Sequence, residues 1–325
     1  MLRSIVLAAG VALIASAAAA VPIGDRYSSF WVFGDSLSDP GNLFAFTSAN
    51  GLAPTPPSPP YFEGRFSNGP VWAEAVADRF AVSGNLAFGG ATATGNADGV
   101  PDLGDQIGLY GVNGAPAAGA RPLASVWFGA NDIIDAIVAF GAQADVVAQV
   151  GAAAVAAADA VGAGVRALGA LGVTDVAVWN LPDIGQTPRF AEFLPDAVGS
   201  LASLATGLFN TRLDAVIADL RGERLNVTRI DTFALFQAVL DNPAAYGVTG
   251  TALPCLFPDA ATAAAFGRPQ LCDDAAGLLW FDSIHPTALG QAVLADTFVA
   301  AVPLPASGLL LAFGLGALAL RRRAA

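Results

Sequence analysis

Segments typical of β-strands alternate with segments typical of helices along most of the chain, and this alternation restricts the possible folds more than any other feature. Buried strands favour β-branched and aromatic residues, whereas helices repeat apolar residues every three or four positions. Four segments have the composition of strands: YSSFWVF from residue 27, LASVWFGAND from residue 123, VTDVAVWN from residue 173 and NVTRI from residue 226. Strands joined through helices form βαβ units, so we expect an α/β fold with a mostly parallel sheet.

Helical patterns fill the stretches between these strands. They cover GPVWAEAVADRF from residue 69, an alanine-rich run from Ala142 to Leu171 that forms one long helix or two, LASLATGLFNTRLDAVIADLRG from residue 201, TFALFQAVL from residue 232 and HPTALGQAVLADTFVAAV from residue 285. The stretch LAPTPPSPP from residue 52 cannot form a regular helix or a central strand, because proline lacks the backbone N–H that both need. We expect it to be an excursion over the surface.

Two of the strands run into polar turns. Ser36 follows the strand FWVF within the tripeptide Gly-Asp-Ser, and Asn131 follows the strand SVWF. In parallel sheets, ligands bind beyond the carboxyl ends of the strands. We therefore expect Ser36 and Asn131 to emerge at the same edge of the sheet and to face a common site.

The chain holds the residues that nucleophilic catalysis by a serine requires. A serine hydroxyl needs a nearby base to take its proton, and His285 is the only histidine in the chain. Asp282 precedes it by three residues, and in a turn before Pro286 this spacing can bring its carboxylate beside Nδ1 of the ring. Negative charge on the attacked carbonyl would need donors, such as a backbone N–H of Ser36, a glycine N–H or an amide side chain.

Several of these residues also have a purely structural interpretation, and a lone histidine before a proline, such as His285, is more often structural than catalytic. Ser36 can cap a helix, and Asn131 and Asp132 can cap the helix that starts with IIDAIVAF. Gly89 and Gly90 can serve a tight turn only. Capping by Asp132 is compatible with a place for Asn131 in the site.

Other polar residues have interpretations that leave the site unchanged. Asp35 and Asp39 are interpreted as residues that fix the loop after the first strand. Arg65, Ser67 and Asn68 either contact a substrate or brace the proline-rich stretch, and both alternatives stay open. Three residues are expected in the core: Trp72, Trp127 and Trp179.

Four blocks of sequence, in the order FGDSLSDPGN, NLAFGGATA, FGANDI and DSIHP, resemble the four blocks of the SGNH, or GDSL, hydrolase family. Between them, YFEGRFSNGPVWAEAVA resembles the family's substrate-side loop and helix, and NLPDIGQTP, FNTRL and NPAAYGVT recur at comparable places in its lipase-like branch. The resemblance covers nearly all of Phe30 to Val302. It implies a three-layer α/β/α sandwich of the flavodoxin-like type, with a parallel sheet of about five strands. No Gly-x-Ser-x-Gly pentapeptide, the mark of the α/β-hydrolases, surrounds Ser36.

The resemblance also implies a role for each residue of the site. Ser36 would be the nucleophile, His285 the base and Asp282 the partner of the base. The oxyanion hole would consist of the backbone N–H groups of Ser36 and Gly90 and the side-chain amide of Asn131. Members of the family need no metal and no cofactor.

The function that this resemblance implies is hydrolysis of carboxylic esters through an acyl-enzyme. The branch resembles bacterial phospholipases, lecithinases and haemolysins, so lipid or fatty acyl esters are the first substrate class. One alternative is a carbohydrate O-acetyl esterase that acts on exported polysaccharide. Another is a surface or matrix protein that keeps the fold without catalysis. Acyl length and head group cannot be derived from the sequence.

The two ends of the chain are interpreted as export and sorting signals around a folded domain of residues 21–302. Residues 1–20 combine Arg3, an apolar run and alanines at their end, as in a secretory signal peptide. A Val-Pro-Leu-Pro-Ala motif starts at Val302, and a short apolar segment and three arginines follow it. Residues 303–325 therefore resemble sorting signals of the PEP-CTERM type. That resemblance implies an exported protein held briefly in the inner membrane until a sorting protease removes the tail. The mature protein would be periplasmic, cell-surface or extracellular.

The net charge argues against nucleic acids as partners, and the two cysteines favour a disulfide over a zinc site. Without the two end segments the chain has eleven basic and twenty-seven acidic residues, a net charge of −16 that repels nucleic acids. Cys255 and Cys272 are the only cysteines, and in an exported protein we expect them to form one disulfide. A zinc site is the alternative, although two cysteines and one distant histidine lack its usual spacing.

Overall fold

The structure is a computed structural model that describes residues 22–113 and 120–302. The signal peptide expected over residues 1–20 and the sorting signal expected over residues 303–325 lie outside the described residues. Both therefore stay predictions. Everything below concerns the described part of the chain.

One sheet of five parallel strands lies at the centre, in the order β2-β1-β3-β4-β5. The strands are β1 (Ser29–Gly34), β2 (Ser83–Asn85), β3 (Pro122–Trp127), β4 (Asp175–Trp179) and β5 (Asn226–Ile230). The chain adds β2 on one side of β1 and then returns to the other side to add β3. Ligands of such flavodoxin-like sheets bind at this reversal, between the carboxyl ends of β1 and β3. The predicted α/β class and the parallel sheet of five strands are confirmed.

The edge strand β2 is the one strand that the sequence pattern misses. Its three residues, Ser-Gly-Asn, include no β-branched or aromatic side chain. It pairs with Phe30–Val32 of β1. A Cβ atom on Gly84 would lie 2.2 Å from the ring of Trp31, so only glycine allows this close approach.

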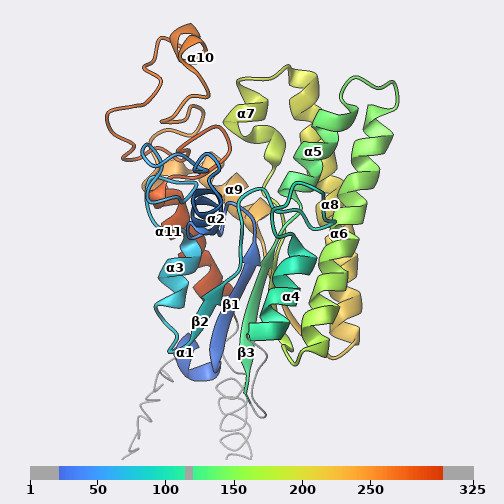
Figure 1. The fold of residues 1–325 in the computed structure, drawn as a ribbon. Helices are drawn as coiled ribbons and strands as arrows, with labels where there is room; N and C mark the ends of the chain where they lie inside the picture. The colour runs from blue at the N-terminus through green and yellow to red at the C-terminus, as the bar shows by residue number, and fades with distance from the viewer. Residues whose placement is uncertain (1–21, 114–119, 303–325) are drawn as a thin grey trace, which may run out of the picture. The chain divides into compact units, whose positions relative to one another are not determined.

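Helices cover both faces of the sheet, as a three-layer sandwich requires (Figure 1). One face carries α3 (Trp72–Ala77) and α11 (Ala288–Ala301), and the other carries α4 (Leu103–Asn113), α6 (Val146–Ala170) and α8 (Asp196–Gly222). Successive side chains of β1 point to opposite layers. The ring of Phe30 lies 5.4 Å from that of Phe298 in α11, whereas Trp31 and Phe33 lie 5.0 and 5.7 Å from Tyr110 in α4.

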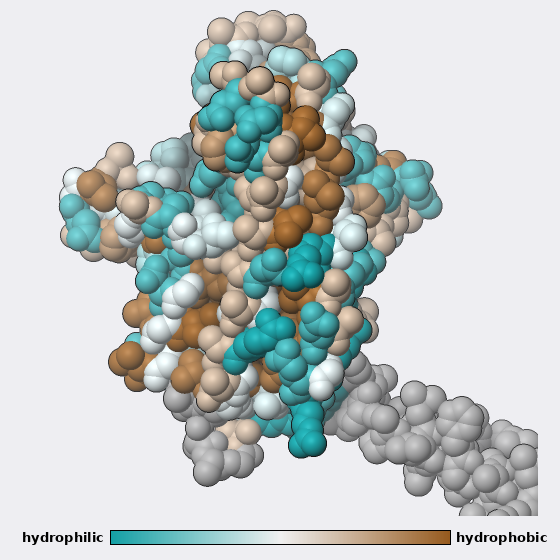
Figure 2. All heavy atoms as spheres, turned by 90° about the vertical axis from the view of Figure 1, so that its right-hand side faces the viewer, coloured by the Kyte–Doolittle hydropathy of each residue, from teal (hydrophilic) through white to brown (hydrophobic). Residues whose placement is uncertain are grey.

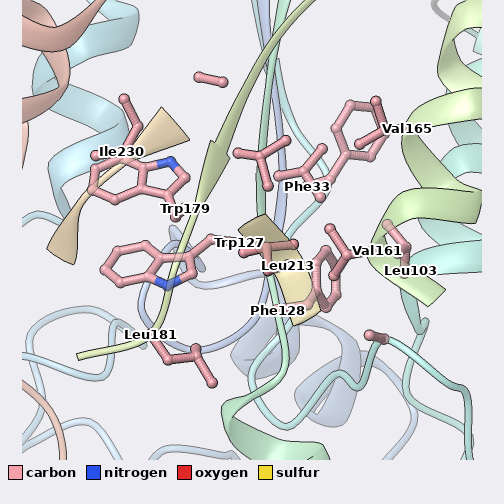
Figure 3. Close-up of a cluster of buried hydrophobic side chains, with 14 of the residues drawn as sticks. Phe33, Leu103, Trp127, Phe128, Val161, Val165, Trp179, Leu181, Leu213 and Ile230 are labelled. Carbon is pink, nitrogen blue, oxygen red and sulfur yellow. The ribbon is translucent and has the colours of Figure 1, made fainter. Parts of the chain in front are cut away.

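Stacked tryptophans fill the layer between the sheet and α3 and α11. The rings of Trp127 and Trp179 stack at 4.4 Å, nearly parallel (Figure 3), and Trp72 lies 4.5 Å from Trp179. None of the three is more than 2% exposed. Their predicted place in the core is confirmed. Because aromatic side chains bury large areas, this cluster gives the carboxyl ends of β3 and β4 a rigid support.

The alanine-rich run forms one helix, α6, of 25 residues. In the described part of the chain, α6 is the single helix long and apolar enough to cross a membrane by length and composition. It packs as a layer of the sandwich instead, since a Cβ on Gly162 would lie 2.5 Å from Val216 of α8. Figure 2 looks onto this side of the molecule, where hydrophobic and hydrophilic side chains are interspersed.

Most shorter elements lie around the carboxyl ends of the strands (Figure 1). They are α2 (Asn42–Ala49), α5 (Ala130–Phe140), η1 (Ile184–Gln186), α7 (Pro188–Ala191), α9 (Thr232–Asp241), η2 (Pro243–Tyr246) and α10 (Ala260–Ala265), whereas α1 (Ile23–Arg26) lies at the opposite end. The proline-rich residues 52–60 form a series of turns without helix or strand, as expected. These connections build the site.

Candidate active site

Ser36 lies in the turn directly after β1, and that turn is held from two sides. Gln106 of α4 accepts from the backbone N–H of Gly34 at 3.0 Å and donates to its carbonyl at 2.9 Å. A Cβ on Gly34 would lie 3.1 Å from the side chain of Ser38, so glycine keeps the turn compact. The Asp35 carboxylate accepts from Leu37 N–H at 3.0 Å. The end of the strand therefore presents Ser36 in one defined position.

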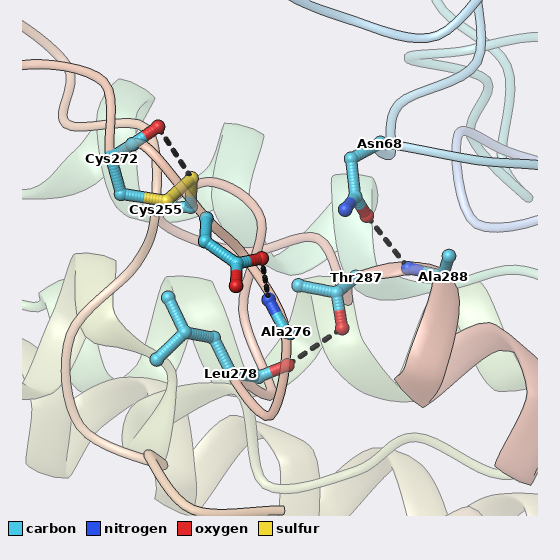
Figure 4. Close-up of a disulfide and its surroundings, with 8 residues drawn as sticks. Asn68, Cys255, Cys272, Ala276, Leu278, Thr287 and Ala288 are labelled. Carbon is cyan, nitrogen blue, oxygen red and sulfur yellow. Dashed lines mark hydrogen bonds between the residues drawn. A yellow bond between two sulfur atoms is a disulfide. The ribbon is translucent and has the colours of Figure 1, made fainter.

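His285 lies in the segment between Trp280 and α11, which is tied to its surroundings by several backbone bonds. The His285 carbonyl accepts from Phe281 N–H at 2.8 Å. Thr287 donates its hydroxyl to the Leu278 carbonyl at 2.7 Å, and the Ala288 N–H donates to Asn68 at 2.8 Å (Figure 4). These bonds fix the chain on both sides of the imidazole.

The structure brings Ser36, His285 and Asp282 together, although Asp282 and His285 lie 246 and 249 positions after Ser36 in the chain. The hydroxyl of Ser36 lies 2.8 Å from Nε2 of His285, and Oδ2 of Asp282 lies 2.7 Å from Nδ1 of the same ring. All three side chains are buried, at 7–8% exposure. A ring that donates Nδ1–H to the carboxylate leaves Nε2 free to accept the serine proton, which is the protonation state that a general base needs.

Asp282 accepts hydrogen bonds from three donors in addition to Nδ1 of His285. Oδ1 accepts from the backbone N–H groups of Ile284 and His285 at 2.9 and 2.8 Å. Oδ2 also accepts from the hydroxyl of Tyr61 at 2.6 Å. Burial favours the neutral acid, but the charge and hydrogen bond of His285 and these further donors outweigh it. The pKa of Asp282 therefore lies below its ordinary value, and the group is a carboxylate.

Tyr61 and Phe66 are residues of this site that sequence reasoning missed. The ring of Phe66 lies 5.0 Å from the imidazole of His285 and 6.0 Å from the ring of Tyr61. Both residues belong to the block YFEGRFSNGP, which follows the proline-rich stretch. No pattern within that block shows that it packs against a histidine more than 200 residues away.

Two of the three candidate oxyanion donors lie beside the serine, and the third is linked to them. Ser36 and Asn131 line the same cavity, whereas Gly90 lies outside its lining. The side-chain amide of Asn131 donates to the carbonyl of Ala91 at 2.9 Å, which connects it to the turn that carries Gly90. Within residues 22–113 and 120–302, the backbone N–H groups of Ser36 and Gly90 have no acceptor.

Asp39 and Asp132 both hold loops by hydrogen bonds. For Asp132 this differs from the role expected from the sequence, which is to cap the helix that starts with IIDAIVAF. Asp39 accepts from four backbone N–H groups, including Gly89 at 2.8 Å. Asp132 lies inside α5, whose N-cap is Gly129, so it does not cap that helix. Its carboxylate accepts from Ala93 and Thr94, at 2.7–3.0 Å. It therefore anchors the loop after Gly90 rather than its own helix.

The residues that follow the proline-rich stretch brace the loop. Arg65 pairs with Glu74 of α3 at 2.7 Å. Ser67 donates to the carbonyl of Pro286 at 3.0 Å, and Asn68 accepts from the first residue of α11. None of them lines the cavity beside Ser36. Of the two alternatives left open by the sequence, bracing is the one that these contacts support.

An apolar cavity of about 110 Å³ adjoins Ser36 and His285. Its walls come from the end of β3, from α9, from the segment before His285 and from α11. The apolar lining includes Trp127, Leu235, Phe236, Val239, Val248, Leu279, Trp280, Val293 and Leu294. Ser36, Asn131 and His285 are among its few polar residues, so the reactive groups lie against a hydrophobic compartment.

Asp35 is a second buried carboxyl group, and it lines the same cavity as His285. Burial raises the pKa of Asp35 to about 7, although the N–H of Leu37 and the charge of His285 oppose the shift. An unfolded aspartate loses its proton at about 3.9. Between these two values the folded state holds a proton that the unfolded state has released, so the stability falls as the pH rises.

We therefore expect Asp35→Asn to gain stability relative to the wild type as the pH rises from about 4 to about 8. The gain in the free energy of unfolding should reach the order of 4 kcal/mol, since each pKa unit corresponds to about 1.4 kcal/mol. Urea unfolding at a series of pH values measures it. Asp273→Asn, at an exposed position, controls for the loss of one charge. A difference that does not change with pH would contradict the expectation.

The two cysteines lie on a loop outside the cavity. The sulfur atoms of Cys255 and Cys272 lie at disulfide distance, with their Cα atoms 4.9 Å apart (Figure 4). The bond would close the loop that carries α10. Within the described residues, no group of three or more histidine, cysteine, aspartate or glutamate side chains could hold a metal ion.

Comparison with known proteins assigns the chain to one family. The family model described as "GDSL-like Lipase/Acylhydrolase" matches residues 31–298. A phosphatidylcholine-sterol acyltransferase of Aeromonas hydrophila is 32% identical over 190 residues, which are 55% of this chain and 50% of that protein. A thermolabile hemolysin of Vibrio parahaemolyticus is 25% identical over 282 residues, which are 84% of this chain and 63% of that protein.

Among solved structures, an extracellular lipase of Streptomyces rimosus overlaps 84% of this chain and 99% of its own, with 18% identity and a TM-score of 0.43. The chain spans only about half to two thirds of the two curated relatives named above. The match to the family model extends over most of the chain, from the strand before Ser36 to α11. The chain belongs to the GDSL-like lipase and acylhydrolase family.

Proposed function

We propose that this protein is an exported serine esterase or lipase that hydrolyses lipid or fatty acyl esters through an acyl-enzyme. The observation that carries the proposal is the continuous hydrogen-bonded series from Ser36 Oγ through His285 to Asp282, with contacts of 2.8 and 2.7 Å. Asp282 is a carboxylate and can stabilise the ring when it takes a proton. This arrangement activates a serine for attack on a carbonyl carbon.

The reaction begins when Oγ of Ser36 forms a bond to the ester carbonyl carbon and Nε2 of His285 takes the hydroxyl proton. The tetrahedral oxyanion accepts hydrogen bonds from the free N–H groups of Ser36 and Gly90 and from Asn131. His285 then gives its proton to the departing alcohol, and the acyl group stays on the serine. Water attacks this ester with His285 again as base, and the acid leaves as the proton returns to Ser36.

The apolar cavity supports a fatty acyl group as the part of the substrate next to the serine. A hydrophobic compartment beside the nucleophile stabilises a hydrocarbon chain, whereas it offers few hydrogen-bond partners to a polar sugar ring. The names of the relatives, a phosphatidylcholine-sterol acyltransferase and a hemolysin, agree with a lipid substrate. Export and brief retention in the inner membrane, ended by a sorting protease, remain proposals that depend on residues 1–20 and 303–325.

The cavity predicts a preference for acyl groups longer than acetyl. A site for one water molecule needs roughly 10–15 Å³ of such space, so a cavity of about 110 Å³ has room for several methylene groups. We expect kcat/KM for p-nitrophenyl esters to rise when the acetyl group is replaced by a longer acyl chain. Mass spectrometry after treatment with a fluorophosphonate should place the adduct on Ser36.

Other outcomes of these measurements would redirect the proposal. Strict preference for acetyl esters would favour a carbohydrate esterase. A protein that neither hydrolyses any ester nor takes up the fluorophosphonate would be a binding protein on the same fold. Transfer of the acyl chain to an added alcohol in place of water would identify an acyltransferase. The panel therefore needs long and short esters, with and without a sterol.

A further inference from the structure

Tyr61 places its hydroxyl on the carboxylate that orients the histidine. Its oxygen lies 2.6 Å from Oδ2 of Asp282, the same oxygen that contacts His285 Nδ1 at 2.7 Å. We propose that Tyr61 is a positioning residue. Its hydroxyl holds the Asp282 carboxylate in one orientation and reduces the negative charge that this carboxylate presents to His285. The effect of Tyr61 on catalysis rests on the proposed function. Its effect on His285 can be measured without a substrate.

The direction of the hydrogen bond follows from the charges of the two partners. Both oxygens of Asp282 already accept from N–H groups, those of Ile284 and His285, as an ionised carboxylate does, and a carboxylate can only accept. Burial and, next, the negative charge of Asp282 raise the pKa of Tyr61 far above its ordinary value. The phenol therefore keeps its proton at all working pH values and donates it. Hydrogen bonds to a charged acceptor are the stronger class in proteins.

With Tyr61 in place, each oxygen of the carboxylate has two donors. Oδ1 takes the backbone N–H groups of Ile284 and His285, and Oδ2 takes the phenol and the imidazole. A carboxylate held by four donors cannot rotate about its last bond without losing several of them. The plane of the carboxylate, and with it the direction of the bond to Nδ1, is therefore fixed.

The position of the phenol is fixed by packing as well as by this bond. The ring of Tyr61 lies 5.1 Å from that of Phe281 and 6.0 Å from that of Phe66, which itself lies 5.0 Å from the imidazole. Ser58 donates its hydroxyl to the Tyr61 carbonyl at 2.9 Å. The proline-rich loop thus has a function beyond covering the surface, because it carries the phenol into the site.

A donor on Oδ2 also changes the charge that the imidazole experiences. A bare carboxylate stabilises a protonated ring more than one whose charge is shared with a phenol. Tyr61 therefore favours the neutral ring, which is the form that accepts the serine proton. The charge of His285 also interacts with that of Asp35, in the turn after β1, and the charge of Asp132 acts on Asp35 in turn. Both stay unchanged in the test below.

The test compares Tyr61→Phe with Tyr110→Phe. Tyr110 is fully buried, and its hydroxyl has no hydrogen-bond partner in the described part of the chain, so its removal is the matched control. His285 is the only histidine, so NMR can follow the titration of its ring without ambiguity. In Tyr61→Phe we expect the midpoint to rise by roughly half a unit to one unit. In Tyr110→Phe it should stay at the wild-type value.

Kinetics supply the second readout. The acid limb of the kcat/KM profile of Tyr61→Phe should move to higher pH by the same amount. Above both midpoints kcat should still fall by about tenfold with KM unchanged, because the carboxylate that orients the ring has lost one of its four donors. An unchanged midpoint in the NMR titration would overturn the proposal, even if the variant were less stable or less active. The titration needs no substrate, so a protein without esterase activity would still decide the role of Tyr61, whereas that inactivity would count against the proposed function alone.

Discussion

Replacing Ser36 with alanine should abolish ester hydrolysis and leave the fold intact. The change removes one oxygen atom, which is the only hydroxyl within reach of His285 Nε2 among the contacts of the described residues. Loss of a catalytic serine that acts together with its histidine costs on the order of 10⁶ in kcat. The lost hydrogen bond should change the free energy of unfolding by only about 1 kcal/mol. Initial rates with p-nitrophenyl esters and thermal unfolding measure the two effects.

Ser38→Ala is the matched control for this experiment. Ser38 lies two residues further along the same turn and is fully buried, but its hydroxyl accepts from Trp72 Nε1 at 3.1 Å rather than facing the histidine. We expect this variant to lose stability and to keep most of its activity. Full activity in Ser36→Ala, from a preparation free of other esterases, would show that the nucleophile is another residue.

Asp282→Asn should have the second largest effect, a loss of about 10³–10⁴ in kcat. An asparagine can accept at only one of its two side-chain positions, and four donors face this side chain. The amide must therefore either meet another donor or turn its NH₂ group toward Nδ1 of His285. In the second case the ring carries its proton on Nε2, where it can no longer accept the proton of Ser36.

The same substitution should change how the stability depends on pH. The pKa of Asp282 is lowered in the folded state, so its carboxylate stabilises the protein above the unfolded value of about 3.9. That contribution disappears as the pH falls through the lower folded value. The stability difference between wild type and Asp282→Asn should thus be full near neutral pH and shrink in acid. Urea unfolding across this range measures it.

Asp274→Asn serves as the control for both properties of Asp282→Asn. Asp274 is exposed, and its carboxylate accepts from a single backbone N–H, that of Ala276 at 2.8 Å. An asparagine can accept the same bond, so activity and stability should stay close to wild type. Wild-type turnover in Asp282→Asn would show that the partner of His285 is not needed for the reaction.

Much of the fold and the central part of the site could be predicted because they depend on local patterns. Strand composition identifies four of the five strands, and helical spacing identifies the long helices. The polar turn after a buried strand marks Ser36, and a single histidine leaves no choice of base. The short strand β2 escapes this reasoning because its pairing with β1, rather than its composition, makes it a strand.

The sequence by itself therefore determined the α/β class, the order of the four blocks and the residues Ser36, Asp282 and His285 as candidates. Only the tertiary structure decided that Tyr61 meets Asp282, that Asp132 anchors a loop instead of capping its helix, and that an apolar cavity adjoins the serine. The physical reason is the distance along the chain between the residues that interact. A periodic pattern is set by neighbours a few positions apart, whereas the phenol and the carboxylate are 221 positions apart and meet only when the sheet and its layers are packed.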